Sequence, residues 1–252
     1  MRVALAGKGG AGKTTIAATL ARVEARRGGQ VIAVDGDSNP NLAAALGIRG
    51  GGAGAPAPLP AALVSRRPRG PLLTAPVEEV LERYAVPAPD GVRLLLMGMA
   101  AHADEGCLCA AHATVSALLG DLAQRPEVLT VVDMEASPEH LSRGTTRHAD
   151  VLLLVAEAYY RSLETVRRLA ALATELPIPR VAVVVNKVRS PAEAEAVVEF
   201  CRRHRLERLA EVAWSDEVVE ADRAGIALLD ASPEGPTVAA ISAMASLLRT
   251  AA

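Results

Sequence analysis

The sequence predicts an α/β fold in which a mostly parallel, doubly wound sheet is flanked by helices. Short apolar runs alternate with longer segments of helical periodicity along most of the chain, as strands and crossover helices do. Half of the residues are hydrophobic but only 2% are aromatic, which favours parallel strands covered by alanine-rich helices. A glycine-rich segment, 7–12, joins the first apolar run to the first helical pattern. The 252 residues suffice for one sizeable core, so we expect a single domain, 1–252.

The first elements follow from local patterns. The apolar run 3–6 is the expected first strand, and apolar residues at helical spacing predict a helix at 14–27. A β-rich run at 31–34 leads into the polar turn 35–40, and a short helix is expected at 41–46. Four glycines and three prolines in 50–60 predict a flexible connection, and no pattern assigns a role to 50–75.

The alternation continues to the end of the chain without an internal repeat. Further strands are expected at 92–97, 128–133, 151–156, 181–185 and 209–213. Helices are expected at 76–84, 112–123, 163–175 and 192–203, with two more after the last strand, the final one within 237–249. Crossover connections of this length make the neighbouring strands parallel.

Charge and composition exclude several classes of partner. The net charge is −2 and the arginines are scattered, so we expect no nucleic-acid partner. No apolar run approaches the ~20 residues of a membrane span, and the chain enters its glycine-rich segment at once, so we expect neither a membrane partner nor a signal peptide. Three cysteines, two of them one residue apart, suit a reducing compartment, and we expect a cytoplasmic protein.

The glycine-rich segment has the spacing of a phosphate-binding loop, GxxxxGK[ST], as in P-loop NTPases. Glycines let successive backbone amides point at phosphate oxygens, and the following helix adds its positive dipole end. The expected ATP-binding residues are Gly9, Gly10, Ala11, Gly12, Lys13, Thr14 and Thr15. Lys13 would reach the β- and γ-phosphates, and the Thr14 hydroxyl would ligate Mg²⁺. A chance glycine turn is disfavoured because strand, loop and helix occur in the required order.

A second lysine narrows the group of P-loop proteins that this segment resembles. Lys8 follows the first glycine, so 8–15 reads KGGAGKTT. This segment resembles the deviant phosphate loop of the MinD, ParA, nitrogenase iron protein and CooC group of ATPases. The resemblance implies that Lys8 crosses a dimer interface to the partner's nucleotide, so that hydrolysis to ADP requires a homodimer.

Two acids at the ends of expected strands complete the catalytic set that the resemblance implies. Asp37 matches the acid that positions the attacking water in the first switch, and Asp35 is expected to fix that loop. Asp133 resembles the acid that holds Mg²⁺ through its shell. By themselves both acids would be interpreted as exposed carboxylates at strand ends, and the phosphate loop favours the functional interpretation.

The second switch departs from the group's D-x-x-A-G pattern. Ser137 and Pro138 stand where a glycine and its neighbour are usual, so a stiffer switch and slow hydrolysis are expected. For the base, Asn186 and Lys187 resemble the group's adenine-recognising pair, the alternative for Asn186 being a helix N-cap. Asp216 falls in the loop expected beside the base, where Trp214 replaces the usual proline.

The segments around Cys107-Leu108-Cys109 and 133–145 carry a narrower resemblance, to CooC-type nickel-insertion ATPases. The matching residues are Met97-Gly98, Gly106, Cys107, Cys109, Asp133-Met134-Glu135-Ala136, Glu139-His140-Leu141 and Arg143-Gly144-Thr145. Ala110 replaces the family's proline after the second cysteine. The resemblance implies maturation of a client metalloenzyme such as carbon monoxide dehydrogenase.

Two thiolates one residue apart make half of a four-cysteine site that a two-fold axis would complete from a second subunit. Zn²⁺, Ni²⁺ and a bridged iron–sulfur cluster all suit such ligands, and the sequence does not choose among them. The alternative is a pair of small buried cysteines, which the polar residues Asp104 and Glu105 disfavour. His102 and His112 are weaker candidate ligands, Cys201 is expected to be structural, and His140 is expected to support the second switch.

These observations favour an ATP-dependent, dimeric metallochaperone. The alternatives are a MinD- or ParA-like positioning ATPase and an electron-transfer ATPase like the nitrogenase iron protein. A lipid anchor for the first alternative is poorly supported, because 241–252 contains Arg249 as its single basic residue.

Overall fold

The computed structural model describes residues 1–48, 57–67, 70–98, 109–135, 139–142 and 144–250. Their main feature is an eight-stranded sheet with the order β10-β9-β8-β1-β7-β2-β6-β5. Every neighbouring pair is parallel except β5 with β6, so the predicted mostly parallel sheet is confirmed. Its strands are β1 (Arg2–Gly7), β2 (Gln30–Gly36), β5 (Val86–Pro87), β6 (Arg93–Leu96), β7 (Val128–Met134), β8 (Val151–Ala156), β9 (Arg180–Val188) and β10 (Glu207–Ala213).

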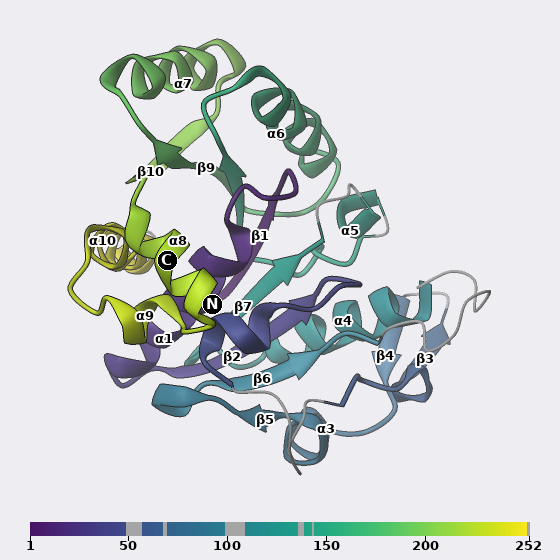
Figure 1. Ribbon diagram of the computed structural model, residues 1–252. Coiled ribbons are helices and arrows are strands. Elements are labelled where there is room, and N and C mark those ends of the chain that lie inside the picture. The colour runs from purple at the N-terminus through teal and green to yellow at the C-terminus, as the bar shows by residue number, and fades with distance from the viewer. Residues whose placement is uncertain (49–56, 68–69, 99–108, 136–138, 143, 251–252) are drawn as a thin grey trace.

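Helices cover both faces of this sheet (Figure 1). One layer contains α1 (Lys13–Arg26), α2 (Leu42–Leu46), α8 (Asp216–Ala224), α9 (Leu228–Ala231) and α10 (Pro236–Thr250). The other contains α3 (Val77–Tyr84), α4 (Cys109–Leu122), α5 (Glu139–Ser142), α6 (Tyr160–Ala173) and α7 (Pro191–His204). The doubly wound arrangement is therefore confirmed.

The two cores arise because successive strand side chains point to opposite faces. In β1, Val3 and Leu5 pack toward α1, whereas Ala4 and Ala6 pack toward α4 and α6. All four are at most 2% exposed, as expected for a central strand covered on both faces. Small alanines on one face allow close approach of the covering helices.

The structure also contains elements that the sequence patterns did not indicate. Two strands, β3 (Val64–Arg67) and β4 (Gly70–Leu73), form an antiparallel pair beside α4, within the region to which no role was assigned. Three helices rather than two follow β10, because the short helix α9 separates α8 from α10. Such short elements have too few residues for a periodic signal. The predicted connection at 50–60 lies mostly outside the described residues and stays a prediction.

One predicted boundary differs in a way that matters for the site. Helix α4 begins at Cys109 rather than at residue 112, so this cysteine belongs to the first turn of a helix. Among the described helices, none is long and apolar enough to span a bilayer.

Candidate functional site

The phosphate-loop residues lie at the carboxyl ends of the central strands. β1 ends at Gly7 and α1 begins at Lys13. Gly7 has φ +153°, and a Cβ there would lie 2.4 Å from the carbonyl oxygen of Val155. Gly12 has φ +97°, and a Cβ there would lie 2.2 Å from Nδ2 of Asn186. Both positions therefore require glycine for space as well as for backbone conformation.

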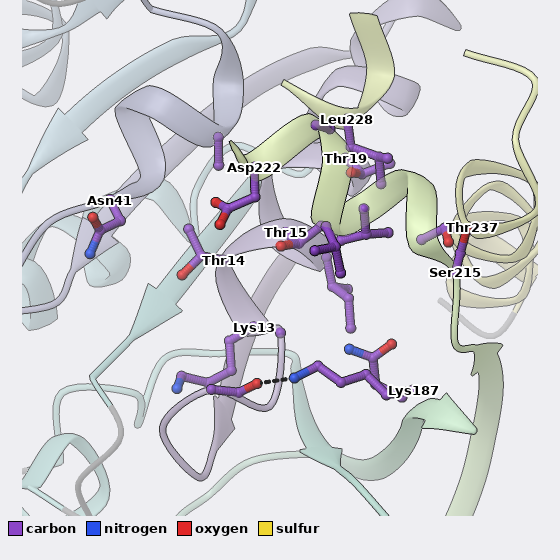
Figure 2. Close-up of a pocket in the computed structure, with 18 of the residues that line it drawn as sticks. Lys13, Thr14, Thr15, Thr19, Asn41, Lys187, Ser215, Asp222, Leu228 and Thr237 are labelled. Atoms are coloured by element: carbon purple, nitrogen blue, oxygen red, sulfur yellow. Dashed lines mark hydrogen bonds between the residues drawn. The ribbon is translucent and has the colours of Figure 1, made fainter. Parts of the chain in front are cut away.

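A cavity of 520 Å³ opens beside this loop and the first turn of α1. Its volume lies within the range of about 300 to 1,000 Å³ that small-molecule sites occupy. Figure 2 shows Lys13 and Lys187 in the lower part of the view and Leu228 in the upper part, with Ser215 and Thr237 at the right. The lining includes Gly9, Gly10, Gly12, Lys13, Thr14, Thr15, Asp37, Asn41, Asn186, Lys187, Trp214, Ser215, Asp222, Leu228 and Thr237. Besides these polar groups, the lining includes the apolar side chains of Ile16, Val218, Val219 and Ile226.

Lys13 is held within the phosphate loop. Its side chain is 6% exposed, and Nζ donates to the carbonyl oxygen of Gly7 at 3.3 Å. Burial lowers the pKa of Lys13, and the neighbouring carboxylates Asp133 and Asp37 oppose that shift. A cation with few protein hydrogen bonds is therefore available to an anion at the loop.

Thr14 and Asp133 are joined directly. The Thr14 hydroxyl donates to Oδ2 of Asp133 at 2.6 Å, and Asp133 is 2% exposed. Burial raises the pKa of Asp133 to about 7, the hydrogen bond from Thr14 acting in the opposite direction. Its other oxygen, Oδ1, is buried without a partner among the described residues. A hydroxyl beside a carboxylate with an unused oxygen fits the oxygen ligands that Mg²⁺ prefers.

The first switch is organised by a buried acid, as the sequence predicted for Asp35. Asp35 is fully buried at the end of β2, and its two oxygens accept hydrogen bonds from the amides of Asp37 at 3.1 Å and Leu42 at 2.8 Å. Burial raises the pKa of Asp35, and these amide bonds lower it. Asp37 itself is half-buried, lines the cavity and accepts a bond from the amide of Asn39 at 2.8 Å.

Asn186 and Lys187 meet the phosphate loop from β9. The Asn186 amide nitrogen donates to the carbonyl oxygen of Ala11 at 2.8 Å, and Lys187 Nζ donates to the carbonyl oxygen of Gly10 (Figure 2). Lys187 Nζ also lies 3.5 Å from Oε2 of Glu157, and the backbone of Lys187 has a left-handed φ of 59°. The pair therefore joins β9 to the phosphate loop.

Four residues predicted for the nucleotide site do not line the cavity, namely Lys8, Ala11, Asp133 and Asp216. Asp216 is exposed at the start of α8 and accepts a hydrogen bond from Nε1 of Trp214 at 3.1 Å. Trp214 lines the cavity, with the Arg189 guanidinium 3.9 Å from its ring centroid. Lys8 lies 5.7 Å from the ring centroid of Tyr159.

Of the cysteine pair, Cys109 is described and Cys107 is not. Ser137, Pro138 and His102 also lie outside the described residues. Within the ranges that are described, no group of three or more His, Cys, Asp or Glu side chains is arranged to hold a metal ion. Cys201 is buried in α7, in keeping with the structural role expected for it.

The buried histidines were only partly anticipated. His112 is 2% exposed and lies 3.2 Å from the Thr145 hydroxyl through Nδ1. Its ring centroid is 4.5 Å from that of His140, whose Nε2 is 2.7 Å from the carbonyl oxygen of Gly36. The sequence predicted support of the second switch by His140, but nothing in it indicated this contact with the first switch.

Sequence patterns also missed part of the cavity wall. Thr237 is 5% exposed, and its hydroxyl oxygen is buried without a partner in the described part of the chain. Leu228 and Thr237 come from α9 and α10, which are distant in sequence from the phosphate loop. No local motif marks these positions.

The chain was compared with known proteins. It matches the CobQ/CobB/MinD/ParA nucleotide binding domain over residues 3–229. It is 34% identical over 242 residues to the carbon monoxide dehydrogenase accessory protein CooC of Rhodospirillum rubrum, covering 92% of this chain and 91% of that protein. An uncharacterized ATP-binding protein of Methanocaldococcus jannaschii is 32% identical, covering 89% and 90% of the two chains. A ParA family ATPase from Chlorobium tepidum TLS shares the fold with a TM-score of 0.73 and 19% identity, covering 97% of each chain.

The similarity to CooC confirms the resemblance inferred from the cysteine and second-switch motifs. The geometry of the loop, with its buried lysine and its threonine–aspartate contact, agrees with the family match. The chain therefore belongs to the CobQ/CobB/MinD/ParA nucleotide-binding family and is a P-loop ATPase.

Proposed function

We propose that this chain is a homodimeric ATP-dependent metallochaperone that delivers nickel to carbon monoxide dehydrogenase or a similar metalloenzyme. The observation that carries the proposal is its similarity to CooC over nearly the whole chain, together with a Cys-x-Cys pair. Cys109 begins α4, and that helix reaches the second switch through His112 and His140. A cysteine pair connected in this way to the nucleotide site suits a metal carrier driven by ATP.

In this proposal the phosphate loop holds the ATP phosphates. The amides of Gly9, Gly10 and 12–15 would donate to phosphate oxygens, whereas the Ala11 amide donates to the Lys8 carbonyl at 3.1 Å, and Lys13 would neutralise the β- and γ-phosphates. Thr14 and Asp133 would hold Mg²⁺, directly and through its shell, and the ion would neutralise charge that develops on the transferred phosphate. Oδ1 of Asp133 has no partner among the residues that the structure describes, and this supports the role, because a buried carboxylate oxygen needs a ligand.

The base is selected by Asn186. One hydrogen of its amide nitrogen is donated to the Ala11 carbonyl, which leaves the acceptor oxygen Oδ1 and a second amide hydrogen for the base. An acceptor suits the amino group of adenine and opposes the carbonyl oxygen of guanine. Lys187 would fix the same loop from β9, and Asp216 would act beside the base by orienting Trp214.

Hydrolysis would use the first switch and a second subunit. Asp37 would orient the attacking water, since it lines the cavity and its loop is fixed by Asp35. Lys8 would leave Tyr159 and reach the partner's nucleotide, as the family resemblance implies. Cys107 and Cys109 of both subunits would then hold one metal, with Zn²⁺, Ni²⁺ or an iron–sulfur cluster as the candidates.

The test is anaerobic purification followed by metal analysis and molar-mass measurement, with and without ATP and Mg²⁺. We expect one metal per two chains, an ATP-driven dimer, and loss of the metal in the double variant Cys107→Ala/Cys109→Ala. Cys201→Ala is the matched control, since it removes a thiol buried in α7 and leaves the pair intact. Retention of metal by the double variant, or a metal-free wild type, would refute the metallochaperone role and leave the ATPase assignment unchanged.

A further inference from the structure

We infer that His140 is a positioning residue that couples the cysteine-bearing helix α4 to the first switch of the nucleotide site, through its contacts with His112 and the Gly36 carbonyl. The inference deepens the proposed function, on which it rests, by naming the residues through which ATP and the cysteine pair influence each other.

In the hydrogen bond between His140 and the first switch, the donor and the acceptor can be assigned. Gly36 can offer only its carbonyl oxygen, so His140 Nε2 carries the proton and donates across 2.7 Å. His140 is 1% exposed, and burial beside His112 lowers its pKa to about 3, which keeps the ring neutral. Its Nδ1 is buried without a partner in the described ranges, so this one bond orients the ring.

A small displacement of Gly36 would also displace the loop that carries Asp37. Gly36 lies between Asp35, which fixes the loop, and Asp37, which lines the cavity. A Cβ at Gly36 would lie 3.0 Å from Cε1 of His140 and 3.1 Å from the carbonyl oxygen of Asp133. The end of β2 therefore packs closely against both the histidine and the β7 acid, and a shift of His140 is transmitted to Asp37.

The other end of the connection is α4. Cys109 and His112 are three residues apart in one helix, so their side chains lie on neighbouring positions of one face. The His112 ring meets that of His140 edge-on, with 4.5 Å between centroids and 77° between planes. Thr145 fixes this arrangement, because its hydroxyl contacts His112 and its amide donates to the His140 carbonyl at 2.9 Å. A movement of the first turn of α4 is thus transferred through the His112 ring to the side chain at position 140, which passes it to Gly36 through the hydrogen bond.

Two substitutions of His140 by amide side chains distinguish the effect of the hydrogen bond to Gly36 from the effect of having any polar side chain at this position. In His140→Gln the amide nitrogen reaches the position of the imidazole Nε2, and the bond to Gly36 is kept. In His140→Asn the amide is one methylene shorter and reaches only the position of Nδ1, so the bond is lost. His148→Gln is the control for histidine removal, because His148 packs beside Gly120, near the end of α4 that is far from Cys109.

The readout is the rate at which iodoacetamide alkylates Cys107 and Cys109 in fully reduced protein, followed by peptide mass spectrometry in a Cys201→Ala background. It is measured in metal-free protein with and without a non-hydrolysable ATP analogue and Mg²⁺. We expect the analogue to change the rate by about fivefold or more in wild type, His140→Gln and His148→Gln, the lower range of allosteric coupling. In His140→Asn, and in His112→Asn, the analogue should leave the rate unchanged while still binding, as followed by Trp214 fluorescence.

Each outcome decides the inference. An unchanged alkylation rate in wild type with bound analogue, or retained coupling in a folded His140→Asn protein, overturns it. Should His140→Asn not fold, His112→Asn decides in the same way, because it keeps an amide at the position of Nδ1 facing Thr145 but removes the ring that meets His140. Because the assay uses no metal, failure of the metallochaperone proposal appears in the metal analysis alone and remains distinguishable.

Discussion

Asn186 donates a hydrogen bond to the carbonyl oxygen of Ala11 at 2.8 Å, although the two residues are 175 positions apart. This bond joins β9 to the phosphate loop. A single contact therefore connects the site proposed for the phosphates with the site proposed for the base.

The substitution Asn186→Ala should weaken ATP binding and reduce the preference for ATP over GTP. Loss of one acceptor for the base corresponds to about 1 kcal/mol, or roughly five- to tenfold in Kd. Titrations followed by the fluorescence of Trp214, the single tryptophan of the chain, give both affinities. Tripolyphosphate, which has no base, is the control ligand. An equal loss of its affinity would mean that Asn186 acts through the loop and not on the base.

Gly12→Ala should abolish nucleotide binding at micromolar concentrations. The new methyl group would lie 2.2 Å from the Asn186 amide at a positive φ, so the loop or Asn186 must move. Gly28→Ala is the matched control, since its φ is +88° but no atom lies within 4 Å of the added Cβ. We expect it to lose only about 1 kcal/mol of stability through backbone strain and to bind ATP normally. Equal binding by both variants would contradict the steric explanation.

Asp133→Asn should lower kcat for Mg²⁺-dependent ATP hydrolysis by about 100-fold or more, because several kcal/mol of charge stabilisation depends on a positioned metal ion. The variant keeps an oxygen for the Thr14 hydroxyl, whose bond to Asp133 is 2.6 Å, so the fold should persist. Steady-state phosphate release across a Mg²⁺ titration measures the effect. An unchanged Mg²⁺ dependence would exclude Asp133 from holding the ion.

Arg22→Met should destabilise the protein by about 2 to 3 kcal/mol, because it removes charge-assisted bonds to two carboxylates. Arg22 is 2% exposed and bonds Asp90 at 2.6 Å and Asp230 at 2.6 and 2.8 Å, joining α1 to α9. Arg26→Met is the control. Arg26 pairs with the same acids, but 41% of its side chain is exposed, so we expect about 0 to 1 kcal/mol. Urea unfolding gives both values, and similar losses would show that burial is not decisive.

The stability of the protein should fall in acid because of His140. Its folded pKa of about 3 lies below the unfolded value of 6.5, so between these values the unfolded chain binds the additional proton. This contribution is fully present above pH 6.5 and is lost as pH falls toward 3, by at most ~1.4 kcal/mol per pH unit. His140→Gln should therefore show a shallower decline between pH 6 and about 4.5 in urea-unfolding midpoints. Parallel declines would mean that His140 is protonated in the folded protein.

The amino-acid sequence by itself determined the fold class, the order of the main elements and the chemistry of the phosphate loop. Short apolar runs and period-3.6 patterns record how each segment is buried, and they placed β1, α1, β2, β7, β8 and β9 close to their observed bounds. The phosphate loop could also be predicted from the sequence, because Gly7 and Gly12 meet backbone and steric demands that no other residue satisfies. The roles proposed for Lys8, Asp37, Asp133 and the cysteines remain predictions.

The tertiary structure decided which distant side chains meet. The contacts of His140 with Gly36, of Thr14 with Asp133 and of Arg22 with Asp230 join residues separated by 104, 119 and 208 positions. Such pairs depend on the strand order of the sheet, which places β7 between β1 and β2. Local periodicity carries no information about that order, because it reports only whether a face is buried and not which segment covers it.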